Sequence, residues 1–186
     1  MIPSSFLKCL RRVGVLMQII KGYLGPRTKV GTITVFGSRD FILRTSRAIK
    51  LLKTKAPDAH RLLHEYIGVI ILATPSGVFT RQLSRTSATM ITMSHKMSCV
   101  PLTEYAAALA HEAFHCELYV RYEKANPGKL VPKPEDIEGG ERGESLCLEY
   151  QCDILRQLGV SEDRVQQYEK SLETRWWEVP FEERNW

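Results

Sequence analysis

The feature that most constrains this chain is the segment from Leu102 to Glu123, which contains neither glycine nor proline. It is rich in alanine, the residue that most favours a helix. Pro101 stands directly before it, at the position where a helix accepts proline best. We therefore predict one long helix over residues 102–123. In such a helix, side chains four residues apart lie on the same face.

The predicted helix carries the segment His111-Glu112-Ala113-Phe114-His115, which has the form HExxH. His111 and His115 lie one turn apart, so both imidazoles can reach a single ion at about 2.0–2.1 Å. Zinc bound there lowers the pKa of a coordinated water to near 7, and Glu112 is placed to act as its general base. The sequence thus predicts a zinc site with a catalytic carboxylate.

Three protein ligands and one open position are typical of catalytic zinc. No third histidine follows in the next turns, so the remaining ligand is sought on the next predicted helix, residues 141–158. Glu141, Glu144 and Glu149 are the candidates there. The sequence ends this helix at Gly159, a residue typical of helix C-termini.

The periodicity of this second helix favours Glu144 over Glu149. At 100° per residue, Glu144 shares a face with the apolar side chains and with Gln151, which becomes a candidate to support a ligand. Glu149 and Asp153 fall on the opposite, polar face. Because a ligand must point toward the first helix, we predict Glu144 as the third ligand and keep Glu149 as the alternative.

These motifs resemble those of gluzincin-type zinc metallopeptidases, which combine HExxH with a glutamate on a following helix. Glu149 to Asp153 is similar to the ExxAD element of many such peptidases, in which the Glu binds zinc and the Asp holds a ligand histidine. Glu144 to Gln151 resembles the Glu-x-x-Cys-Leu-x-x-Gln helix of small bacterial zincin-like proteins. The resemblance covers residues 87–158, and it implies a small twisted sheet over the metal helix, with a peptide substrate paired to the edge strand.

The remaining patterns predict an α+β chain. Strands are expected at residues 30–36, 67–73 and 88–94, the last near a sheet edge, because these segments are rich in β-branched residues or alternate. Helices are expected at residues 41–53, 58–66 and 161–174. We divide the chain into a basic N-terminal appendage, residues 1–26, and a zincin-like domain, residues 27–186. The tail aromatics, Trp176, Trp177, Phe181 and Trp186, are expected to pack back.

Charge and cysteine content narrow the functional classes. Residues 1–55 hold twelve Lys and Arg but one acidic residue, whereas residues 130–186 hold seven basic and fourteen acidic residues. No nucleic-acid motif accompanies the basic segment, so we expect no nucleic-acid partner. Five cysteines without framework spacing predict reduced thiols. The apolar run at residues 13–20 is too short to cross a bilayer. We expect a cytoplasmic protein without a transmembrane segment.

The sequence is compatible with three functional hypotheses. The favoured one is zinc-dependent hydrolysis of a peptide or protein substrate, with the oxyanion-stabilising residue open among His95, Tyr119, Tyr122 and Arg142. The second is a non-catalytic, zincin-like zinc-binding module that serves in interactions. The third is a latent protease whose cleft is covered by the N-terminal segment or by the loop at residues 124–140.

Overall fold

The computed structural model of the protein describes residue 14 and residues 16–74, 76–78, 89–125 and 141–171. Within these residues, five strands form one mixed sheet in the order β1-β2-β3-β5-β4. Strand β2 (Ile33–Phe36) is parallel to β3 (Ile67–Leu72), and β3 is parallel to β5 (Thr89–Met93). The outer strands β1 (Arg27–Val30) and β4 (Gly77–Val78) are antiparallel to their neighbours. The predicted α+β composition is confirmed.

The strand predicted at residues 30–36 is confirmed only over residues 33–36, because the chain forms a hairpin there. Val30 pairs with Ile33, so the turn contains only Gly31 and Thr32. Gly31 has φ of +62°, a left-handed conformation that glycine adopts at no steric cost. Because alternating residues stand on both sides of this short turn, the sequence pattern resembles that of one continuous strand.

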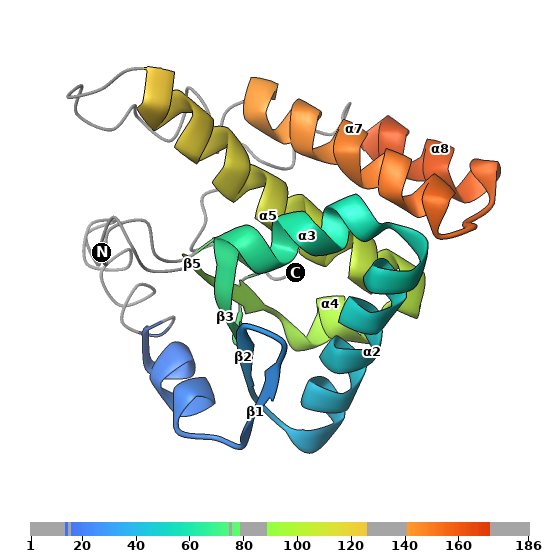
Figure 1. The fold of residues 1–186 in the computed structure, drawn as a ribbon. Coiled ribbons are helices and arrows are strands. Elements are labelled where there is room, and N and C mark those ends of the chain that lie inside the picture. Colours follow the sequence, from blue (N-terminus) through green and yellow to red (C-terminus); the bar gives the residue numbers. More distant parts are fainter. Residues whose placement is uncertain (1–13, 15, 75, 79–88, 126–140, 172–186) are drawn as a thin grey trace, which may run out of the picture.

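The two faces of the sheet are covered by different parts of the chain (Figure 1). Ile33, Val35 and Ile70 point into the main core, which the long helices cover. Phe36 and Ile71, one residue further along their strands, point into a smaller cluster with Ile19. Side chains alternate between the faces of a strand, so neighbouring residues join different cores. Residues 16–23 are helical and lie on this second face.

Two helices connect β2 to β3 and support the long helix. Helix α2 (Arg39–Lys55) begins at Ser38, whose hydroxyl accepts a hydrogen bond from the Phe41 amide. Helix α3 (Pro57–Tyr66) follows with its proline in the first turn. Both pack against α5 (Leu102–Ala125), which extends slightly beyond the predicted helix. These three predicted helices are confirmed.

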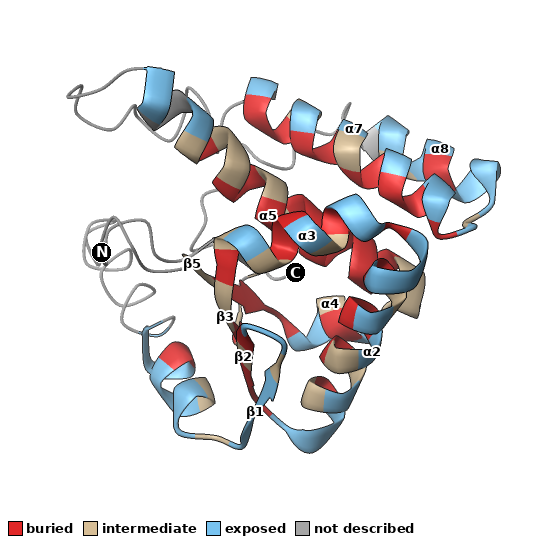
Figure 2. Ribbon diagram, viewed as in Figure 1, coloured by how far each residue is buried: buried red, intermediate tan, exposed pale blue. Residues whose placement is uncertain are grey.

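Helix α5 lies at the centre of the helical layer, and residues 104–111 in its first half are all buried (Figure 2). Helix α7 (Glu141–Gln157) packs on the side of α5 away from the sheet, and α8 (Glu162–Ser171) packs on α7. Phe114 of α5 stacks on Tyr150 of α7, with ring centroids 4.5 Å apart. Gly159 ends α7 as predicted, with φ of +81°. This packing places the histidines of the HExxH segment at the interface between α5 and α7.

Two short elements were not predicted from the sequence: β4 and helix α4 (His95–Cys99). The tail aromatics, which are expected to pack back, lie outside the described residues. The same holds for the segment before residue 14 and for most of the loop at residues 124–140. In the part of the chain that the structure does describe, no helix has both the length and the apolarity needed to cross a membrane.

Candidate metal centre

Helix α5 directs both motif histidines toward α7. The Nε2 atoms of His111 and His115 lie 3.0 Å apart. Glu144 of α7 faces the same point, with its Oε2 atom 3.6 Å from Nε2 of His111 and 3.5 Å from Nε2 of His115. All three side chains are buried. Two helices thus bring two imidazoles and one carboxylate to a single small volume.

The spacing of these three atoms suits a divalent metal ion. Ligand bonds of about 2.0–2.2 Å in a tetrahedral site separate two donor atoms by roughly 3.3 Å. The three observed separations, 3.0, 3.5 and 3.6 Å, lie around that value. Moreover, Oε2 of Glu144 is buried and has no hydrogen-bond partner among the residues that the structure describes. A bound cation would satisfy this carboxylate oxygen, which is otherwise costly to bury.

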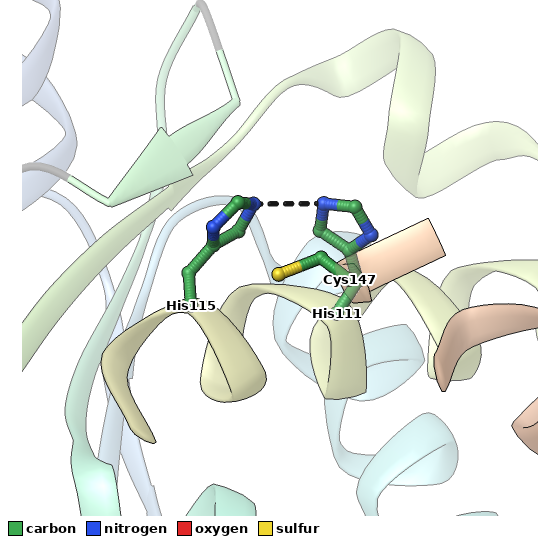
Figure 3. Close-up of side chains that lie close together, drawn as sticks. All are labelled: His111, His115 and Cys147. Atoms are coloured by element: carbon green, nitrogen blue, oxygen red, sulfur yellow. Dashed lines mark hydrogen bonds between the residues drawn. The ribbon is translucent and has the colours of Figure 1, made fainter. Parts of the chain in front are cut away.

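A fourth donor, Cys147, lies one helical turn after Glu144. The donor atoms of His111, His115 and Cys147 all lie within 4.8 Å of one another, and this group of three buried residues could hold a metal ion. Figure 3 shows the Cys147 side chain extending toward the two imidazole rings. In the sequence no histidine stands close to Cys147. The packing of α7 on α5 brings the thiol beside His115.

The two possible triads share both histidines and differ in the third ligand. Oε2 of Glu144 lies 3.5 and 3.6 Å from the two Nε2 atoms, and the Cys147 thiol lies within 4.8 Å of the same histidines. The Oε2 atom of Glu144, which has no hydrogen-bond partner among the described residues, needs a cation more than a buried thiol does. On this ground we rank Glu144 first, with Cys147 as an additional donor.

Charges at the site are strongly coupled. Burial alone would raise the pKa of Glu144, but the imidazoles of His111 and His115 outweigh it and lower that pKa far below its usual range. Burial likewise opposes the imidazolium of His115, but Cys147 and Glu144 raise its pKa well above the ordinary value. Burial also raises the pKa of the Cys147 thiol. A positive charge between Glu144 and Cys147 is therefore favourable. A bound metal ion would supply such a charge.

The other candidate ligands on α7 lie elsewhere. Glu149 and Asp153 are exposed, and Asp153 contacts the guanidinium of Arg156 at 3.5 Å rather than a histidine. Gln151 is buried on the same side of α7 as Glu144. The Nδ1 atoms of His111 and His115 have no hydrogen-bond partner within the described residues. The predicted supporting role of Gln151 thus stays a prediction.

Glu112, the predicted general base, is half-buried on α5 beside the cluster. Its negative charge contributes, after burial, to raising the pKa of Cys147. Among the candidate oxyanion-stabilising residues, Tyr119 is buried one turn after His115. His95 and Arg142 are exposed, and the side chain of Tyr122 lies outside the described residues.

The sheet edge differs from the expectation. Strand β5, predicted as the edge strand, has β4 paired to its outer side at Thr92 and Ile91. In the described residues, the outermost strand on this side is therefore β4. A peptide could add directly to β5 only beyond the short segment that β4 covers.

Comparisons of the chain with protein-family models, curated proteins and solved structures find no match. The resemblance to gluzincins accordingly rests on the residues of the motif and on the site.

Proposed function

We propose that this protein is a zinc-dependent hydrolase of peptide bonds, of the gluzincin type. His111, His115 and Glu144 would hold the ion, and Glu112 would be the general base. The observation that carries this proposal is the convergence of Oε2 of Glu144 on both Nε2 atoms, at 3.5 and 3.6 Å, beside the carboxylate of Glu112.

The chemistry follows from the roles of these side chains. A bound zinc ion would supply a Lewis acid that polarises the peptide carbonyl and lowers the pKa of the attacking water. Glu112 would accept the proton of the attacking water and then donate it to the leaving amine. The two imidazoles and Glu144 would hold the ion, since each projects from a helix packed in the core.

The donor set supports zinc over magnesium or calcium. Mg²⁺ and Ca²⁺ prefer oxygen ligands, whereas imidazole nitrogen suits zinc and other late first-row ions. Two imidazoles with one carboxylate form the ligand set of many catalytic zinc sites.

Metal content of purified full-length variants tests the site. Wild-type protein is expected to hold about one zinc ion per chain by elemental mass spectrometry, in line with a single three-ligand site. His115→Ala and Glu144→Ala should lose the ion, because each removes one of three ligands. Glu149→Ala, a change of the same type on the exposed face of α7, is the matched control and should keep it. Zinc lost from Glu149→Ala but kept by Glu144→Ala would overturn the ligand assignment.

The Glu112→Gln variant tests the catalytic part separately. It should keep its zinc and lose peptide hydrolysis by about 10²- to 10⁴-fold, since a general base contributes a factor of that size. Hydrolysis of a mixed peptide library, followed by mass spectrometry, measures this loss. Full activity in a zinc-loaded Glu112→Gln protein would contradict the mechanism.

A second candidate function is a non-catalytic zinc-binding module. The observation that favours it is burial, because every donor in the cluster is at most 6% exposed. Structural zinc sites are typically closed in this way. Zinc retention without hydrolysis of any library peptide, in the wild type and in Glu112→Gln alike, would support this alternative.

A further inference from the structure

The Cys147 thiol has an arrangement that the three-ligand site does not use. Its side chain is completely buried, and the thiol is free rather than part of a disulfide. Its Sγ atom lies within 4.8 Å of the ligand nitrogens of His111 and His115. Residues three apart on a helix share a face, so Glu144 and Cys147 both face α5.

The four donors come in two pairs from two packed helices. His111 and His115 supply one pair from α5, one turn apart, and Glu144 and Cys147 supply the other from α7. Zinc in closed protein sites has four ligands in a tetrahedron, and thiolate sulfur is one of its preferred donors. Because Glu144 Oε2 and Cys147 Sγ each lie within reach of both histidines, the two pairs can supply these four ligands.

We propose that Cys147 is the fourth protein ligand of the metal ion held by His111, His115 and Glu144, and that it occupies the position left open in a catalytic zinc site. This inference rests on the metal site of the proposed function. When Sγ binds the ion, the S–H bond is replaced by an S–metal bond and the thiol proton leaves to solvent. The resting site is then closed, and hydrolysis requires that Cys147 give up its position to water.

A matched residue on the same helix provides the control. Cys152 is also a free, buried cysteine of α7. It stands five residues further along the helix and is not a member of the donor group. Cys152→Ala therefore removes an equivalent thiol from the same helix without touching the proposed ligands.

The test uses full-length protein loaded with Co²⁺ in place of zinc and freed of excess ion. A thiolate bound to Co²⁺ gives a strong near-ultraviolet charge-transfer absorption, which imidazole and carboxylate ligands do not give. We expect this band in wild type and in Cys152→Ala, each with about one Co²⁺ per chain as a single site requires. It should be lost in Cys147→Ala. Cys147→Ser, which nearly preserves the side-chain volume, should also lose the band and serves if the alanine variant does not fold.

The outcomes separate this inference from the proposed function. About one Co²⁺ per wild-type chain that is lost in Glu144→Ala but gives no charge-transfer band would overturn the role of Cys147 and leave the three-ligand site standing. A band that persists in both Cys147 variants would also overturn it. A folded wild type that binds no metal would refute both ideas. The band without peptide hydrolysis in any variant would support Cys147 as a ligand and contradict the hydrolase.

Discussion

Glu104 shows how single residues fix the helices around the candidate metal site. Its carboxylate lies in the first turn of α5 and is only 4% exposed. Arg164 of α8 donates two hydrogen bonds to it, at 2.8 and 2.9 Å, and the Tyr168 hydroxyl donates a third at 2.6 Å. The hydrogen bonds from Arg164 lower the pKa of Glu104 and outweigh the opposing effect of burial. This carboxylate therefore joins the start of α5 to α8.

A pH-dependent loss of stability is expected from this cluster. Because the folded-state pKa of Glu104 is depressed, its contribution is fully present above the unfolded value of about 4.3 and is lost as pH falls through the folded pKa. Glu104→Gln should lower the free energy of unfolding by about 1.5–3 kcal/mol at neutral pH, the range for hydrogen bonds to charged groups. The difference from wild type should shrink in acid, as measured by urea unfolding.

The control for this prediction is Glu117→Gln. Glu117 pairs with Arg121 at 2.6 Å on the surface of the same helix, and Arg121 is largely exposed. Such pairs contribute about 0–1 kcal/mol. Equal destabilisation by Glu104→Gln at neutral pH and at a pH below the folded pKa of Glu104 would show that packing rather than charge is responsible.

At the same scale, the sequence allowed part of the site to be predicted. Helical periodicity correctly placed Glu144 on the inward face of α7 and Glu149 on the exposed face. It could not show that the turn carrying Cys147 lies opposite His115, because the register between two helices is set by tertiary packing such as the stacking of Phe114 on Tyr150. Zinc binding and the catalytic role of Glu112 stay predictions.

At the scale of elements, long segments were predicted well and short ones were not. The helices α2, α3, α5 and α7 have periodic patterns or clear breakers at their ends, and their existence was predicted. The β1–β2 turn has only two residues, so the predicted strand ran through it, and residues 27–29 of β1 were not predicted. Strand β4 has two residues and no detectable pattern, and missing it made β5 look like an edge strand.

At the same scale, the helical residues 16–23 lie close to the sheet, and this close approach depends on Gly22. A Cβ atom at Gly22 would lie 2.6 Å from Cγ2 of Ile71 and 2.9 Å from the backbone oxygen of Leu72. Gly22→Ala should therefore destabilise the protein by about 1–3 kcal/mol, as overpacking does. Urea unfolding measures the change.

Gly14→Ala is the matched control for the Gly22 prediction, because a Cβ atom at Gly14 would meet nothing within 4 Å. Gly14 is helical, so this change should be neutral or slightly stabilising, since alanine favours a helix over glycine. If Gly22→Ala unfolds at the same urea concentration as wild type, residues 16–23 do not pack on β3 as tightly as the structure indicates.

At the scale of the whole molecule, the candidate metal site lies where two groups of helices meet. Helix α5 packs on α2 and α3 and also on α7, α8 packs on α7, and all of them contribute to the main core. The candidate ligands come from both α5 and α7, and they include a buried carboxylate oxygen that has no hydrogen-bond partner among the described residues. A metal ion should therefore stabilise the fold as well as supply chemistry.

Removal of the metal should consequently lower the thermal stability of the entire chain. Zinc at a free concentration of about 100 times its dissociation constant stabilises the native state by about 2.7 kcal/mol. For a chain of this size, 1 kcal/mol shifts the unfolding temperature by about 2–4 °C, so a rise of roughly 5–10 °C is expected. Differential scanning calorimetry with zinc and with a chelator measures it.

His115→Ala should show no zinc-dependent shift. His60→Ala should respond as wild type, although His60 and His64 form another close pair with ring centroids 4.4 Å apart. If the zinc-dependent rise in unfolding temperature is lost in His60→Ala and kept in His115→Ala, the stabilising ion lies on α3. It would then not link α5 to α7.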